Sequence, residues 1–263
     1  MGIGIVQGRL LPPEGDRIQS FPRIRWQEEF ALATEAGLQF IEWVYDLHGV
    51  DVNPIASEDG IRSIRLLAAE YGVAVRSLCA DYFMDCPELD PRKLVWLIEH
   101  CRLAGISRIV LPFVDASRIQ DSSHAERVAA MLCEVLPEAG PNSVEIHLET
   151  SLDPHSFGHL LDAIRNPLCK ITYDSGNSAS LGYSPVEEFA AYGERIGSVH
   201  IKDRLRNGGT VPLGTGSTDF TTVFRELKKI SYGGDFVLQA ARETTGEEVA
   251  LARRNASWLL SQL

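Results

Sequence analysis

The segment SVEIHLETSLDPHSFGHLLDAIRNPLCKITYD, residues 143–174, shows the pattern that decides the fold. Two short β-rich runs, 143–149 and 169–174, stand on either side of a longer amphipathic run over 155–165. The short runs have the length and composition of buried strands, and the longer run has the length of a helix. The order strand, helix, strand predicts two parallel strands that are joined by a crossover helix.

This unit repeats along the whole chain. The predicted strands are residues 2–8, 38–44, 73–80, 107–113, 143–149, 169–174, 197–202 and 235–240. The predicted helices are residues 24–36, 57–71, 90–104, 121–137, 155–165, 184–193, 219–229 and 246–263. Glycines at positions 37, 72 and 105 directly follow three of these helices, where a left-handed residue commonly ends a helix.

Eight such units without a break in composition predict an α/β protein with a (β/α)₈ TIM-barrel fold, in one domain over residues 1–263. An open, doubly wound sheet is the alternative fold. Such sheets usually have fewer repeats and often carry a glycine-rich nucleotide loop after the first strand. The first predicted strand instead ends in Val6-Gln7-Gly8-Arg9, without a G-x-G-x-x-G pattern, and this favours the barrel.

Composition narrows the range of partners and compartments. The 263 residues carry a formal net charge of −11, which disfavours binding to the phosphates of nucleic acids. No apolar run is long enough to predict a membrane helix, and the first residues do not have the pattern of a secretory signal. The five cysteines are scattered and form no C-x-x-C pair, which is typical of a reducing compartment. We therefore expect a cytoplasmic protein whose partners are neither nucleic acids nor membranes.

Polar side chains follow the predicted strands at the barrel end where active sites lie. Glu149, Asp174, His200 and Gln239 come from four consecutive strands, each at or near the predicted C-terminal end. Two carboxylates, one imidazole and one amide oxygen suit a divalent cation such as Mn²⁺, Mg²⁺ or Co²⁺. Zinc remains an alternative, less favoured without a cysteine or a second histidine. Each residue alone would more readily make a structural hydrogen bond at the barrel rim, and it is the set of four that predicts one metal site.

Three segments carry a resemblance to a known family: ITYDSGNSASLGY (171–183), SVHIKDR (198–204) and VPLGTGSTDF (211–220). Together they resemble the xylose-isomerase-like TIM-barrel superfamily of sugar phosphate isomerases and epimerases. The chain is most similar to the L-ribulose-5-phosphate 3-epimerase branch, which includes proteins like hexulose-6-phosphate isomerase. The resemblance covers nearly the whole chain and is sharpest in the C-terminal half.

The resemblance implies a role for each predicted metal ligand. Glu149 matches the carboxylate that binds the metal and acts as one acid/base, while Asp174 and His200 match the next two ligands. Gln239 stands where the epimerases normally carry a second Glu. We therefore take Glu149 and Gln239 as the catalytic candidates, although an amide cannot accept a proton at neutral pH. The implied cofactor is one divalent metal ion, with Mn²⁺ as the first choice.

Five further residues are predicted to bind substrate. They are Lys202, Arg204, Asn177, Arg9 and Glu42. The three basic side chains would clamp a phosphate or polarise a substrate oxygen, and Glu42 would bind sugar hydroxyls. Ion pairs at an acidic barrel rim, including a Glu42–Arg9 pair, are the alternative interpretation. The last helix, 246–263, would serve packing or a homo-oligomer contact.

The predicted activity is that of a metal-dependent isomerase or epimerase of a small ketose or ketose phosphate. Glu149 would remove a proton beside the carbonyl, and the metal would stabilise the resulting enediolate. Two alternatives remain: a lyase like the inosose dehydratases, and a catalytically silent barrel that binds a sugar. A DNA-repair enzyme of the endonuclease IV type is disfavoured because the predicted rim has too few histidines for its trinuclear zinc cluster.

Overall fold

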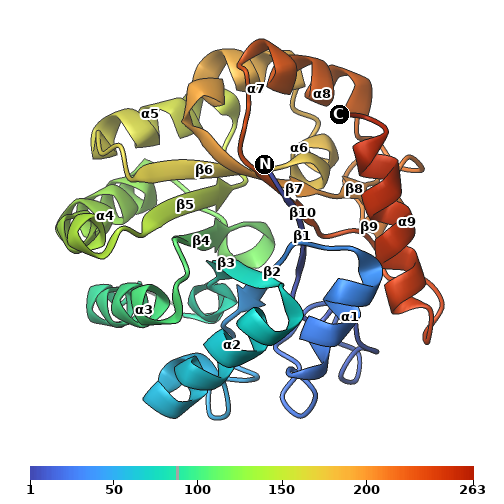
Figure 1. Ribbon diagram of the computed structural model, residues 1–263. Helices are drawn as coiled ribbons and strands as arrows, with labels where there is room; N and C mark the ends of the chain where they lie inside the picture. The colour runs from blue at the N-terminus through green and yellow to red at the C-terminus, as the bar shows by residue number, and fades with distance from the viewer. Residues whose placement is uncertain (87–88) are drawn as a thin grey trace.

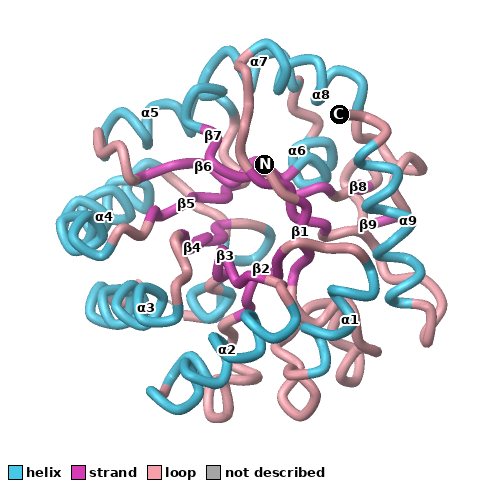
Figure 2. Tube along the Cα trace, viewed as in Figure 1, coloured by secondary structure: helices cyan, strands magenta, loops and turns pink. Residues whose placement is uncertain are grey.

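Eight parallel strands close into a barrel with helices around it (Figure 1), and the strands form the inner ring of Figure 2. The computed structural model describes residues 1–86 and 89–263. Around the barrel the order is β1-β10-β7-β6-β5-β4-β3-β2, so that β1 pairs with both β10 and β2. The barrel strands are β1 (Ile3–Val6), β2 (Phe40–Val44), β3 (Ala74–Cys79), β4 (Arg108–Phe113), β5 (Glu145–Thr150), β6 (Cys169–Asp174), β7 (Ile196–Ile201) and β10 (Asp235–Leu238). This confirms the predicted TIM barrel and each of its eight strands.

The outer ring consists of the predicted helices. They are α1 (Glu28–Ala36), α2 (Glu58–Tyr71), α3 (Pro91–Ala104), α4 (Ser122–Asn142), α5 (Pro154–Ile164), α7 (Pro185–Tyr192), α8 (Phe220–Lys229) and α9 (Glu248–Leu260). Gly37, Gly72 and Gly105 adopt the left-handed conformation at the ends of α1, α2 and α3, as the sequence predicts. None of the described helices combines the length and the hydropathy that a membrane crossing requires.

Some elements differ from the sequence-based expectation. Helix α4 runs on to Asn142, past the predicted end at residue 137, although Pro137 and Pro141 lie inside it. Leu136 and Ala139 are buried in these last turns, and their packing on the core outweighs the cost of the prolines. The unpredicted elements include a short helix α6 (Ser175–Leu181) directly after β6, and an antiparallel hairpin of β8 (Asp203–Arg204) and β9 (Thr210–Val211) after β7.

The long connection between β1 and α1 is held against the barrel by an aromatic cluster. Phe21 and Trp26 of this connection and Phe30 of α1 pack around Trp43 of β2, with ring centroids 5.5 to 6.4 Å apart. Trp43 is fully buried, and its indole N–H donates to Asn53 Oδ1 at 2.9 Å. The cluster fixes the segment around Gln19 over the end of the barrel where the strands finish.

An ion pair crosses the barrel at the opposite end. Asp235 begins β10 and Arg108 begins β4, and these strands are not neighbours in the sheet, so their contact spans the interior. Arg76 reaches the other oxygen of Asp235 at 2.9 Å. Burial alone would raise the pKa of Asp235, but the two arginines outweigh it and hold that pKa below its usual value.

We predict that Asp235→Asn lowers the free energy of unfolding at pH 7 by about 3 kcal/mol, because it leaves Arg108 buried without its charge partner. A lowered pKa means that Asp235 stabilises the fold at neutral pH and loses this contribution as the pH falls through its native pKa. The unfolding curves of wild type and variant, measured in urea, should therefore converge below about pH 4. Asp59→Asn is the control, since its pair with Arg62 is exposed and worth less than about 1 kcal/mol. Equal stability of all three proteins at pH 7 would contradict the prediction.

Candidate metal centre

Three of the four predicted metal ligands meet inside the barrel mouth. Glu149 lies at the end of β5, Asp174 ends β6 and His200 lies in β7, where it is the register partner of Asp174. One ligand atom from each residue lies within 4.8 Å of the other two, and all three side chains are buried. His200 Nδ1 is 3.4 Å from Glu149 Oε2 and 3.9 Å from Asp174 Oδ2.

The free atoms of this cluster fit a metal ion. Among the described residues, His200 Nδ1 and Asp174 Oδ2 are buried atoms without a hydrogen-bond partner. A buried polar atom without a partner is costly, and one shared cation would satisfy both. Two ligand atoms that each bind one ion at ~2.1 Å are at most ~4.2 Å apart, a limit that both distances from His200 Nδ1 respect. The donor set, one imidazole and two carboxylates, suits Mn²⁺, Co²⁺, Mg²⁺ or Zn²⁺.

Asn177 orients both carboxylate ligands. Its side-chain amide donates to Glu149 Oε1 at 2.6 Å, and its backbone N–H donates to Asp174 Oδ1 at 2.7 Å. The second contact caps α6, so the helix that the sequence did not reveal is what places Asn177 here. Each carboxylate thus has one oxygen engaged by Asn177 while its other oxygen faces His200.

The far side of His200 contacts Glu42 of β2. His200 Nε2 lies 2.8 Å from Glu42 Oε1, and both side chains are fully buried. The other oxygen of Glu42 accepts from Ser77 Oγ at 2.7 Å. A carboxylate behind a ligand histidine fixes the ring and leaves the opposite nitrogen free for a metal. Glu42 was predicted from the sequence to contact substrate hydroxyls. The structure instead places it on the far side of His200, behind the candidate metal ligands.

Burial and the neighbouring charges shift the pKa values of two side chains in the cluster, Glu149 and His200. Burial and the neighbouring Asp174 raise the pKa of Glu149 to about 7, although His200 and Lys202 oppose this shift. Burial disfavours the charged form of His200, but the carboxylates of Glu42, Glu149 and Asp174 outweigh burial and raise the pKa of His200 to about 9. Without a metal, the imidazolium is thus the cation that balances these carboxylates.

Lys202 and Gln239 border the cluster. Lys202 Nζ lies 3.5 Å from Asp174 Oδ2 and donates to Gln239 Oε1 at 3.3 Å. The Gln239 amide in turn donates to Gln19 Oε1 at 2.8 Å, and Gln19 donates to Asp81 Oδ2 at 2.7 Å. A chain of polar contacts therefore runs from a ligand carboxylate across the barrel mouth to the end of β3. Gln19 was not among the predicted site residues, because it lies in the long β1–α1 connection, which has no periodic sequence pattern.

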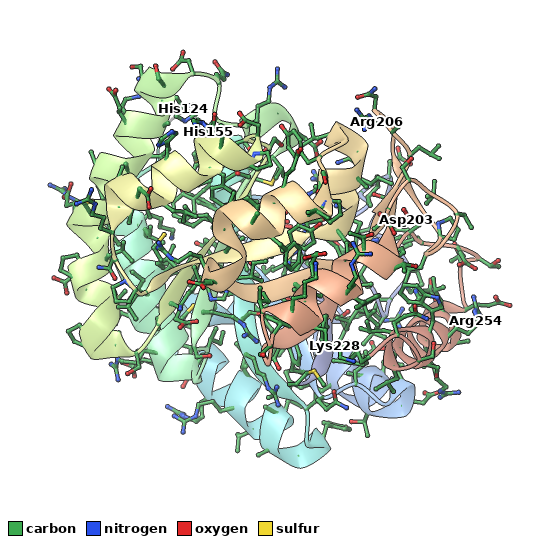
Figure 3. The ribbon with its side chains drawn as sticks, turned by 90° about the horizontal axis from the view of Figure 1, so that it is seen from above. His124, His155, Asp203, Arg206, Lys228 and Arg254 are labelled. Atoms are coloured by element: carbon green, nitrogen blue, oxygen red, sulfur yellow. The ribbon has the colours of Figure 1, made fainter. Side chains whose placement is uncertain are left out.

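The sequence motifs that carry the family resemblance have local physical reasons. A Cβ at Gly176 would lie 2.7 Å from Lys202 Cγ, so the glycine after β6 makes room for the lysine after β7. Asp203 is buried and accepts hydrogen bonds from the backbone N–H groups of Gly214, Gly216 and Thr218 at 2.8 to 3.1 Å. Figure 3 shows Arg206 at the edge of the molecule and Asp203 nearer its middle. The motif 211–220 thus folds around a carboxylate adjacent to Lys202.

The remaining predicted residues lie in two different places. Arg204 donates to Asn177 Oδ1 at 2.8 Å, and Asn177 in turn donates to Glu149, so Arg204 reaches Glu149 through Asn177. Arg9 donates to the carbonyl of Ala240 at 2.9 Å and lines a pocket between β1, β10 and α9. Neither its hydrogen bond nor that pocket involves a predicted metal ligand. The structure thus brings together every predicted site residue except Arg9.

The chain is similar in sequence and in fold to several known proteins. An L-ribulose-5-phosphate 3-epimerase of Salmonella paratyphi A is 26% identical over 264 residues, covering 90% of each chain. An inosose dehydratase of Geobacillus kaustophilus is 32% identical over 136 residues, which cover 44% of this chain and 43% of the dehydratase. A crystal structure of the IOLI protein with a bound zinc atom superposes with a TM-score of 0.77 at 17% identity. This superposition spans 100% of this chain and 99% of the zinc-bound chain.

The family model described as xylose isomerase-like TIM barrel matches residues 30–262. That match spans most of the barrel, including the three candidate metal ligands, the cap of α6 and the loop around Asp203. At 17% identity the solved structure supports the fold alone, whereas the family model supports membership directly. The chain belongs to the xylose isomerase-like TIM barrel family.

Proposed function

We propose that this protein is a divalent-metal-dependent epimerase or isomerase of a small ketose or ketose phosphate. The observation that carries the proposal is the buried cluster in which Glu149, Asp174 and His200 turn ligand atoms toward one another. It lies at the end of the barrel where this fold carries its active sites. The epimerase relative covers nearly the same length and supports the sugar as substrate class.

The metal would be held by Glu149, Asp174 and His200, with Gln239 as the fourth ligand. Mn²⁺ is our first choice, because oxygen donors outnumber the single nitrogen and no thiolate is among them. When bound, the metal would supply Lewis-acid polarisation of a carbonyl and an adjacent hydroxyl oxygen of the substrate. Lys202, beside Asp174 and Gln239, would donate to a further substrate oxygen.

Glu149 would transfer the proton. Its carboxylate would accept the proton from the carbon beside the carbonyl and return it, as a positioned general base does. Asn177 holds one oxygen of Glu149, and Arg204 holds the oxygen of Asn177, so the position of the base is fixed by two neighbours. Gln239 removes the usual second base, and this favours chemistry on one face of the substrate, as in aldose–ketose isomerisation.

A second candidate is a lyase that removes water from an inosose, and the inosose dehydratase relative favours it. Both reactions begin with a proton removed beside a carbonyl, so the cluster serves either. Mass spectrometry separates them, because dehydration changes the mass of the product and isomerisation does not.

We predict that the protein binds one equivalent of Mn²⁺ and that His200→Ala weakens this binding at least about 100-fold, since it removes a ligand. Glu42→Gln should weaken it about 10- to 100-fold, because the partner behind a ligand histidine tunes affinity on that scale. Isothermal titration of the metal-free proteins measures both effects. His159→Ala, at an exposed position on α5, is the control that should bind as the wild type does. Unchanged affinity in His200→Ala would contradict the proposed site.

We predict that the Mn²⁺-loaded protein incorporates deuterium from D₂O beside the carbonyl of its ketose substrate. Glu149→Gln should slow this exchange about 10²- to 10⁴-fold, the usual contribution of a positioned general base. The readout is proton NMR of a panel of ketoses and ketose phosphates. Glu187→Gln, on the exposed side of α7, should leave the exchange rate unchanged. Binding of a ketose without any metal-dependent exchange would identify a silent sugar-binding barrel instead.

We predict that Gln239→Glu raises the ratio of C3 epimerisation to C1–C2 isomerisation at least about tenfold, because it restores a base on the second face. Gln239→Ala is the matched control, since it removes the amide without adding a base. Chromatography of the product sugars gives both rates for each protein. If the wild type already epimerises C3 as fast as Gln239→Glu, another residue supplies the second proton.

A further inference from the structure

A pocket outside the candidate metal centre contains two arginines that form no ion pair with any residue that the structure describes. It lies between β1, β10 and α9, and Arg9 and Arg242 line it together with Thr244, Thr245 and Asn255. Within residues 1–86 and 89–263, no carboxylate oxygen lies within 4.0 Å of either guanidinium. In a chain with a net charge of −11, two neighbouring arginines without a carboxylate partner are unexpected.

Arg9 is almost completely buried, with 8% of its surface exposed. Its one hydrogen bond goes to the carbonyl of Ala240, and its Nε is a buried donor without a partner in the described chain. Burial, and then the nearby Arg242, lower the pKa of Arg9 to about 10, and the negative charge of Asp81 opposes only part of this shift. Arginines in protein interiors are normally paired, and this one is not.

Arg242 does not supply a countercharge. Its guanidinium donates to three backbone carbonyls of the β1–α1 connection, those of Gly8, Leu11 and Ile18. Carbonyl groups satisfy the donors but carry no net charge. Glu29, the buried carboxyl group near Arg242, has its pKa raised by burial to about 8 and is therefore largely neutral at pH 7.

Two glutamates also line the pocket, and they do not neutralise both arginines. Glu243 pairs with Arg254 at 3.0 Å, and Glu248 accepts from the backbone N–H of Gly246 at 3.0 and 3.1 Å. With Glu243 engaged by Arg254, two arginines face one glutamate across this pocket. Its net charge is positive, and the hydroxyl groups of Thr244 and Thr245 add hydrogen-bond donors.

We propose that this pocket binds a phosphate group, either as inorganic phosphate or as part of a phosphomonoester. The planar fork of Arg9 matches two oxygens of a phosphate, and a dianion would offset the repulsion between Arg9 and Arg242. The hydroxyls of the threonines and the amide of Asn255 would take the remaining oxygens. Because Arg242 also holds the β1–α1 connection, an occupied pocket would stiffen the segment that carries Gln19 into the barrel mouth.

The test is isothermal titration of inorganic phosphate into the full-length protein in a phosphate-free buffer. We expect saturable binding to the wild type and at least a tenfold loss of affinity in Arg9→Gln, which removes a charge-assisted contact. Asn255→Asp adds a negative charge with almost no change in shape and should cause a loss of similar size. This second variant keeps the test valid if Arg9→Gln fails to fold, which circular dichroism would reveal. Arg253→Gln, at an exposed position of α9, is the control that should keep the wild-type affinity.

A second titration distinguishes the two sources of the phosphate group. A ketopentose 5-phosphate is titrated into the Mn²⁺-loaded wild type, into His200→Ala and into Arg9→Gln. If the affinity for the sugar phosphate falls in both His200→Ala and Arg9→Gln, while that for inorganic phosphate falls only in Arg9→Gln, the pocket receives the phosphate of the sugar substrate. If neither affinity changes in His200→Ala, the pocket serves a free phosphate compound, and this result stands even if the proposed sugar chemistry fails.

Three results would overturn the proposal. One is the absence of saturable phosphate binding to the wild type. Another is equal phosphate affinity in the wild type, Arg9→Gln and Asn255→Asp. The third is a loss of phosphate binding in Arg204→Gln but not in Arg9→Gln, because phosphate would then bind at the barrel mouth.

Discussion

The register between neighbouring parallel strands is the constraint on which the candidate site depends. Asp174 at the end of β6 is paired with His200 in β7, and Glu149 is the last residue but one of the adjacent strand β5. Closure of the barrel brings these ends to one level, so residues far apart in sequence meet in a small buried volume. A shift of one residue in any of these strands would turn its ligand away from the cluster.

Neighbouring residues contact one polar atom of each candidate metal ligand and leave its other polar atom free to face the cluster. Asn177 takes one oxygen from each carboxylate, and Glu42 lies against the far nitrogen of His200. The atoms that remain are the ones that face one another. Such preorganisation matters in a buried site, because a free side chain would otherwise turn toward whichever partner relieved its charge.

The two sides of the barrel mouth differ in charge. The cluster of Glu149, Asp174 and Glu42 is acidic and is balanced in the protein alone by His200 and Lys202. Beyond Leu238, where β10 ends, the pocket of Arg9 and Arg242 is basic, because the two arginines outnumber Glu248 while Glu243 pairs with Arg254. A substrate or ligand that carried both hydroxyl groups and a phosphate would find complementary surroundings on both sides.

The sequence by itself determined the eight strands and the eight outer helices, because hydrophobic period and length are local properties. It also identified Glu149, Asp174 and His200, since the end of a strand can be located from sequence and the barrel fixes where strand ends meet. Only the tertiary structure decided that Glu42 stands behind His200, that Arg9 lies in a separate pocket and that Gln19 reaches Gln239. These contacts join segments across the barrel or from a long connection without a regular period. Which partner such a side chain meets depends on the packed arrangement of the whole chain, and no local pattern encodes it.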